Sequence, residues 1–268
     1  MRLESIEESQ KMNDNILFRF HIKDMKFQIL LMLLMTVVNL FRICKQYPDV
    51  DKTFIDYLLY SFNSDMNIVF SYSLILLFFL YQYNRQMHAR VIDIMKYKSR
   101  RQWLLYHYKV LFLFNAGYLA VQVLLYLIQA VFFLNFKSDF STFMMQKWGF
   151  VYESGRSVSS VVGANCGNLF LYLLTISSLF MLLVTLFQSE QIGFVLCYGV
   201  IILDLIVFRA RITALYPVSF MGKIMLGYNN VVENCKINIG YWVVQIFMYI
   251  VLNFFVVHHM PLSWERGK

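Results

Sequence analysis

The stretch Val110–Leu134, VLFLFNAGYLAVQVLLYLIQAVFFL, decides the fold class of this chain. It runs for 25 residues without a charged side chain. A helix needs about 20 consecutive, mostly apolar residues to cross the hydrocarbon core of a bilayer. A single strand in lipid would leave its backbone N–H and C=O groups without hydrogen bonds, so we expect the stretch to be a membrane-spanning helix.

The composition of the whole chain agrees with this expectation. Hydrophobic residues make up 59% of the 268 positions and charged residues only 15%. A soluble domain carries about 25% charged residues, and a soluble protein of this size could not bury so much apolar surface in one core. The high aromatic content excludes disorder, and the few glycines and prolines exclude a collagen-like chain.

Five further stretches are long and apolar enough to cross a membrane. The alternating pattern of an outer-membrane barrel is absent. The sequence therefore predicts an all-α, polytopic membrane protein with a single transmembrane domain over residues 1–268. The six predicted spans are 27–43, 66–83, 110–134, 168–187, 192–208 and 241–257.

The segment 1–26 precedes the first span and ends in an amphipathic stretch. Ile16, Leu17 and Phe20 share one face of a helix there, and basic residues occupy the opposite face. This spacing predicts a cytoplasmic, interfacial helix that lies among the lipid headgroups. The alternative is a solvated tail with some affinity for the membrane.

The segment 84–109 is the most basic part of the chain, with seven Lys and Arg against one acid, Asp93. Lys and Arg collect in cytoplasmic loops, so this loop and, by counting spans, both termini are predicted to be cytoplasmic in a multi-pass cell-membrane protein. The formal net charge of +8 is then a signal of topology. We expect membrane lipid around the chain and no nucleic-acid partner.

The basic loop also carries apolar residues at helical spacing. Val91, Ile92 and Met95 form one short apolar face, and Trp103 with Leu104 forms another after a polar break. A loop that docks on a soluble protein needs both apolar anchors and steering charges. We interpret the loop as a docking element; the alternative is a basic loop that contacts anionic lipid.

The stretch Arg90–Leu104 reads R-x-x-D-x-M-K-Y-K-S-R-R-Q-W-L. It resembles the first cytoplasmic loop in membrane subunits of type-2 ATP-binding-cassette exporters, in particular small bacterial permeases for peptides or bacteriocins. The glycine usual in that loop is absent here, with Lys98 in that part of the segment. That family also has six spans, cytoplasmic termini, a very short second cytoplasmic turn and a partly re-entrant outer loop, which would be 209–240 here.

The resemblance implies a transport function with partners. A separate ATP-binding-cassette ATPase would bind ATP and contact the coupling residues, and a second permease copy or paralogue would complete the transporter. The cargo would be amphipathic or a peptide, as in bacteriocin export or self-immunity. The coupling residues implied by the resemblance are Val91, Ile92, Met95, Lys98, Arg100 and Arg101.

Polar residues inside the predicted spans form a second candidate site. Asn115, Gln122 and Gln129 are spaced by seven, so they share one face of the third span. This stripe could line a translocation path, or it could hold helices together by hydrogen bonds. In the fifth span, Asp204 is expected to form an interface ion pair with the nearby Arg209 or Arg211; the alternative is a proton relay.

The sequence favours no catalytic role for this chain. It lacks the P-loop motif G-x-x-x-x-G-K-[ST], the H-E-x-x-H motif and the G-x-S-x-G motif, and its four cysteines show no C-x-x-C spacing. We therefore expect no catalytic residue, no metal and no cofactor in this chain. The rival interpretation is a motorless membrane protein, acting in immunity, sensing or assembly.

The apolar face of the basic loop distinguishes these two interpretations. Replacing Val91, Ile92 and Met95 together with Asp should abolish binding of the ATPase, because apolar anchors are lost while the basic charge that sets the topology remains. The measurement is co-purification of the ATPase with the tagged chain, with membrane insertion checked in parallel. Unchanged co-purification of an ATPase with the triple variant would contradict the transporter interpretation.

Overall fold

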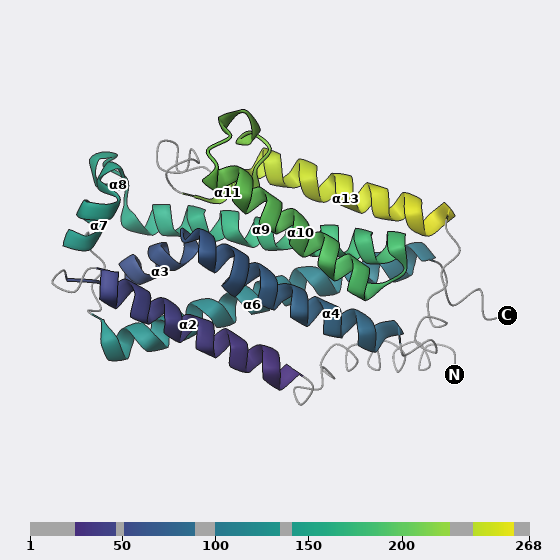
Figure 1. The fold of residues 1–268 in the computed structure, drawn as a ribbon, viewed down its shortest axis with the longest axis horizontal. Coiled ribbons are helices and arrows are strands. Elements are labelled where there is room, and N and C mark those ends of the chain that lie inside the picture. Colours follow the sequence, from purple (N-terminus) through teal and green to yellow (C-terminus); the bar gives the residue numbers. More distant parts are fainter. Residues whose placement is uncertain (1–24, 47–50, 89–99, 135–140, 226–237, 260–268) are drawn as a thin grey trace, which may run out of the picture.

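The computed structural model describes residues 25–46, 51–88, 100–134, 141–225 and 238–259, and Figure 1 shows them as a bundle of helices. Within these ranges there is no strand, which confirms the all-α fold class. In chain order the described helices are α2 (Lys26–Gln46), α3 (Phe54–Phe62), η2 (Asn67–Leu74), α4 (Ile75–His88), α6 (Arg100–Phe133), α7 (Thr142–Lys147), α8 (Gly149–Glu153), α9 (Val158–Phe187), α10 (Glu190–Arg209), η3 (Thr213–Leu215), α11 (Phe220–Ile224) and α13 (Ile239–His259).

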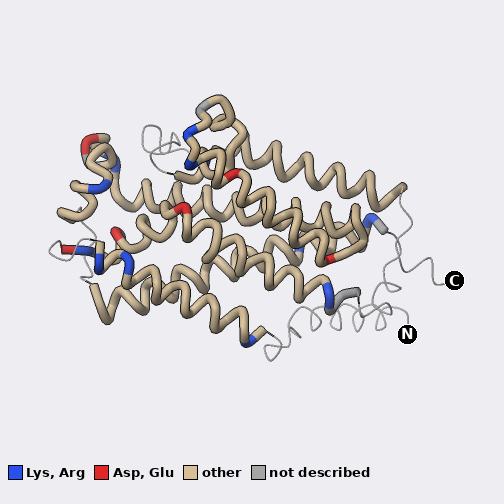
Figure 2. Tube along the Cα trace, viewed as in Figure 1, with Lys and Arg blue, Asp and Glu red and all other residues tan. Residues whose placement is uncertain are grey.

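Five of the described helices are long and apolar enough to cross a membrane: α2, α6, α9, α10 and α13. The number rises to six if α3 and the continuous helix after it count as one bent span. Figure 2 shows that the charged residues of the described helices lie toward their two ends, with an uncharged middle. Most of the predicted interfacial helix, residues 1–24, lies outside the described residues.

Helix α9 occupies the centre of the bundle, and α10 and α13 pack along it (Figure 1). Within its most apolar stretch 72% of residues are buried, against 11% for α13. Both helices are apolar on all sides, so sequence alone does not separate them. A helix of this kind is stable either inside the protein or against lipid. In this bundle α9 lies inside the protein, and α13 lies at the surface.

The peripheral helices turn large apolar side chains outward. Phe41 of α2 is 71% exposed, and Phe247 of α13 and Val195 of α10 are each 67% exposed. Contiguous apolar surface of this kind is rare on a soluble monomer and marks contact with lipid or protein. The outward faces of α2, α10 and α13 therefore fit a bundle surrounded by hydrocarbon.

Two helices begin earlier than the apolar stretches that predicted them. Helix α6 begins at Arg100, before the predicted start at Val110, and α9 begins at Val158, before Asn168. At about 1.5 Å per residue, helices of 34 and 30 residues are longer than a hydrocarbon core of about 30 Å. Hydropathy identifies the portion of each helix that would lie in lipid. The helical hydrogen bonds of α6 and α9 continue beyond that portion.

Helix α3 lies in the segment between the first two predicted spans, which was expected to be an outer loop. A capping box begins it: the Thr53 N–H donates to Asp56 Oδ2 at 2.6 Å, and the Asp56 N–H donates to Thr53 Oγ1 at 3.3 Å. Tyr57 and Leu59 are completely buried against the bundle. The capping box is visible in the sequence, but the burial of so short a helix depends on α6 and α9.

A tight connection joins α9 to α10. Gln188 adopts a left-handed conformation with φ 51°, and Ser189 caps α10 by accepting a hydrogen bond from the Ile192 N–H at 3.3 Å. The two helices then approach so closely that a Cβ on Gly193 would lie 2.6 Å from Val184 Cγ2. Glycine at position 193 is what allows this close approach of α9 and α10.

Replacing Gly193 with Ala should lower the free energy of unfolding by about 1–3 kcal/mol, because Val184 has to shift to admit the new methyl group. Thermal unfolding of the purified protein in detergent measures this loss. Gly199→Ala in the same helix is the matched control, since a Cβ there meets no described atom within 4 Å. Equal unfolding temperatures for the two variants would contradict the close contact.

Candidate functional site

The interior of the bundle contains a broken helix. Helix α3 meets the following helix at 84°, and the bend falls at residues 63–66. The next turns, η2, form a π-helix, in which Ser73 Oγ donates to the Ile68 carbonyl at 2.6 Å. π-Helical turns are rare and frequent at functional sites, and broken helices form the binding sites of many transporters. The bend and η2 are therefore the centre of the candidate site.

A chain of side-chain amides and hydroxyls surrounds the bend. The Asn39 amide of α2 donates to Ser61 Oγ of α3, and the Asn67 amide of η2 donates to Asn39 Oδ1 at 2.7 Å. All three side chains are at most 2% exposed. These bonds fix the angle of the bend, because each one joins a different helix to Asn39.

A second set of bonds connects α3 to α6. The Tyr57 hydroxyl lies 2.8 Å from the Thr36 carbonyl oxygen and 2.6 Å from Gln129 Oε1, and the Gln129 amide donates to Thr36 Oγ1 at 2.9 Å. The hydroxyl has one proton, so it donates to one of its two acceptors at a time. We refer to Thr36, Asn39, Tyr57, Ser61, Asn67 and Gln129 together as the polar cluster.

All three residues of the predicted stripe on α6 lie against other parts of this chain. Gln129 belongs to the polar cluster, Asn115 donates to Ser177 Oγ of α9 at 2.9 Å, and Gln122 donates to the Tyr118 hydroxyl at 3.2 Å. Asn115 and Gln122 are completely buried. The bonds of Asn115 and Gln129 join α6 to other helices, as the packing alternative requires, whereas the bond of Gln122 stays within α6. The role of the stripe in a translocation path stays a prediction.

Tyrosines are the interior residues that the sequence analysis missed. The Tyr72 hydroxyl donates to the Tyr126 hydroxyl at 3.3 Å, and the Tyr172 hydroxyl lies 2.6 Å from Ser73 Oγ. The Tyr57 and Tyr126 rings meet edge to face with centroids 5.0 Å apart. Tyrosine usually lies at the membrane–water interface, so a tyrosine in the middle of a predicted span is a signal of a buried hydrogen bond.

The chemistry available at the polar cluster is hydrogen bonding by neutral groups. It holds amides and hydroxyls and lacks the carboxylate, imidazole and thiolate groups that usually bind metal ions in proteins. Among the residues that the structure describes, no group of three or more His, Cys, Asp or Glu side chains could hold a metal ion. Beside the cluster, the buried atoms Gln122 Oε1 and Ser71 Oγ have no hydrogen-bond partner within the described ranges.

A second cluster lies at the opposite end of the molecule from Arg101, on α7. Lys147 Nζ lies 4.0 Å from the ring centre of Tyr60 and 5.1 Å from that of Trp148, and burial lowers the pKa of Lys147 to about 8. The rings attract the ammonium form, which opposes part of the cost of burying it. The contact fastens α7 to α3.

Two of the six predicted coupling residues are described, and both lie at the beginning of α6. Val91, Ile92, Met95 and Lys98 lie outside the described residues, while Arg100 and Arg101 form the first turn of α6. Close by, the Tyr83 hydroxyl of α4 lies 3.0 Å from His107 Nδ1 of α6, and His107 is buried. This contact joins the two helices on either side of the predicted coupling loop.

The acids near the opposite end of the bundle take partners that differ from those expected. Asp204 accepts hydrogen bonds from the backbone N–H groups of Phe220 at 3.2 Å and Met221 at 2.9 Å, and so caps α11. Arg209, which was expected to pair with Asp204, forms an ion pair with Asp65 at 2.6 Å. The spacing in sequence favoured the nearer acid, but the fold brings the bend of the broken span to Arg209.

No protein-family model, curated protein or solved structure matches the chain significantly.

Replacing Tyr57 with Phe should lower the free energy of unfolding by about 1 kcal/mol, because the Thr36 carbonyl and the half-buried Gln129 amide oxygen lose the one donor that they share. Unfolding in detergent, followed by circular dichroism, measures the loss. Tyr81→Phe is the matched control, since the Tyr81 hydroxyl has no hydrogen bond to any described residue. A Tyr57→Phe variant as stable as this control would contradict a structural role for the polar cluster.

Proposed function

We propose that the chain is the membrane-spanning subunit of an ATP-driven exporter that moves an amphipathic or peptide cargo, in bacteriocin export or self-immunity, and works with a separate ATPase subunit. The main support is α6, which runs unbroken from the basic segment at Arg100 through the bundle to Phe133. A displacement of its basic end would reach the polar cluster along one continuous helix, because helices transmit such motion as rigid elements.

Other features of the described residues support the same proposal. The connection between α9 and α10 is very short, and the short helix α11 packs between α9 and α10 in the segment that leads to α13. The resemblance to type-2 exporters implies a short second cytoplasmic turn and a partly re-entrant outer loop in these positions. The Tyr83–His107 contact couples α4 to α6 at the basic end.

The interior suggests where a cargo path would lie. The amides of the stripe on α6 bond to side chains of the same chain, so the inside of a single copy is largely occupied by its own packing. A path between two copies, opened and closed by rocking of the helices, requires no break in these bonds. The proposal accordingly includes a second permease copy or paralogue.

The same self-contained packing favours one other function. A bundle in which the amides of the stripe bond within one chain could also work alone, as a motorless immunity, sensor or assembly protein. The two candidates differ in whether an ATPase binds the basic end.

Purification of the tagged full chain in mild detergent tests the proposal, with mass identification of co-purifying proteins and an ATPase assay. We expect a stoichiometric partner with a P-loop and vanadate-sensitive ATP hydrolysis, both retained by a Lys45→Glu variant at the far end of α2. A pure chain without hydrolysis, from cells shown to express such an ATPase, would contradict the exporter and favour the motorless protein.

A further inference from the structure

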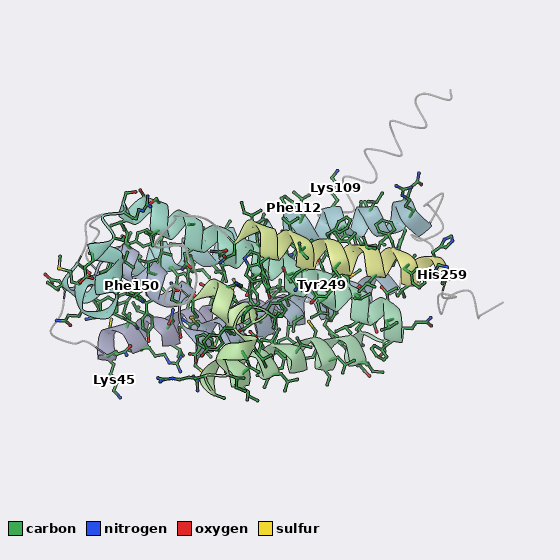
Figure 3. The ribbon with its side chains drawn as sticks, turned by 90° about the horizontal axis from the view of Figure 1, so that it is seen from above. Lys45, Lys109, Phe112, Phe150, Tyr249 and His259 are labelled. Carbon is green, nitrogen blue, oxygen red and sulfur yellow. The ribbon has the colours of Figure 1, made fainter. Side chains whose placement is uncertain are left out.

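A pocket of about 340 Å³ opens between the beginning of α6 and the end of α13. Arg101, Phe254, Val257 and His258 line it. Figures 1 and 3 both place the end of α13, marked by His259 in Figure 3, beside the beginning of α6. The pocket therefore lies at the basic end of the bundle, where the apolar part of both helices ends.

The packing of the two helices explains the pocket. The Asn253 amide of α13 donates to the Tyr108 hydroxyl of α6 at 3.1 Å, which holds the helices together at that level. Arg101 lies two turns before Tyr108 on the same face of α6, and Val257 lies one turn after Asn253 on the same face of α13. From this hydrogen bond toward the basic end, the space between the helices is lined by Arg101 on α6 and by the last turns of α13.

The lining combines cationic and apolar groups. The Arg101 guanidinium presents planar N–H donors that match phosphate oxygens, and His258 supplies a ring N–H in either protonation state. Arg101 is exposed, and no carboxylate within the described ranges forms an ion pair with it. Phe254 and the buried Val257 make the rest of the wall apolar, which suits a ligand with an anionic head and a hydrocarbon continuation.

Apolar surface leads away from the pocket along both helices. Leu105, one turn after Arg101 on α6, is 51% exposed. On α13, Val251 and Phe247 precede Phe254 by three and seven residues, share its side of the helix and are exposed. Figure 3 shows Phe112 on the outer side of α6, farther along the same helix. An acyl chain can pack along this surface, whereas free phosphate has no apolar group to contact it.

We propose that this pocket binds an anionic phospholipid, with its headgroup phosphate between Arg101 and His258 and an acyl chain along the exposed side chains of α6 and α13. The proposal does not depend on the exporter function. Arg101 is also a predicted ATPase contact, so lipid binding is measured on the chain purified without a partner.

The test compares retention of phosphatidylglycerol and phosphatidylcholine by the full chain in native mass spectrometry. We expect preferential retention of phosphatidylglycerol, weakened about tenfold in Arg101→Gln, which removes a charge-assisted donor, and reduced less in His258→Gln, which removes the ring N–H. Arg101→Lys keeps the charge but loses the planar donors, and should fall between the wild type and Arg101→Gln. Arg85→Gln, at the same end on α4 but outside the pocket, should bind like the wild type.

Three results would overturn the proposal. Equal losses in Arg85→Gln and Arg101→Gln would show general attraction to a basic surface, and equal retention of phosphatidylcholine would show that the headgroup charge is not recognised. Displacement of the lipid by millimolar inorganic phosphate would assign the pocket to soluble phosphate. If Arg101→Gln does not fold, Arg101→Lys and His258→Gln decide the same question.

Discussion

A polar side chain inside an apolar bundle has to find its hydrogen-bond partner there, because neither lipid nor a packed interior supplies one. The rest of this structure depends on that constraint at Asn39. Its amide satisfies Ser61 on one side and Asn67 on the other, and so determines how α3 can meet η2. With α3 held at 84° to the next helix, the Tyr57 hydroxyl reaches acceptors on α2 and α6. Tyr57 thereby connects α3 to both helices. The bend is thus a consequence of satisfied amides, and no glycine or proline occurs at residues 63–66.

The fold class and the approximate positions of the apolar helices could be predicted from the sequence, because hydropathy reports directly on contact with lipid. The ends of α6 and α9 could not, since helical hydrogen bonds continue into water without a change in composition at the boundary. The burial of helix α3 could not be predicted from the sequence either. Its capping box is local, but its burial comes from α6 and α9, which are distant in sequence. For the same reason α9 and α13, which are both strongly apolar, could not be ranked by how deeply they are buried.

In the candidate site too, features set by local sequence could be predicted and features set by the fold could not. The spacing of Asn115, Gln122 and Gln129 was enough to place them on one face of a helix, because that follows from helical geometry alone. Gln122 bonds to Tyr118 one turn earlier on the same helix, a pairing that helical spacing allows. The partners of Asn115 and Gln129, which are Ser177 and Tyr57, come from other helices, and no local rule selects them. Asp204 shows the limit most clearly. Proximity in sequence favoured an arginine, but its carboxylate meets backbone N–H groups that α11 brings to it.

The π-helix η2 affects how this span would tolerate the loss of one residue. An α-helix turns by about 100° per residue, so an inserted residue normally rotates everything after it onto another face. A π-helical turn absorbs one extra residue while the helices on both sides keep their facing. The span containing η2 can therefore lose one residue by reverting to a regular α-helix, with Asn67 at the start of η2 and Tyr83 after it still directed at their partners. Related chains can differ in length by one residue at this place and still share the same bundle.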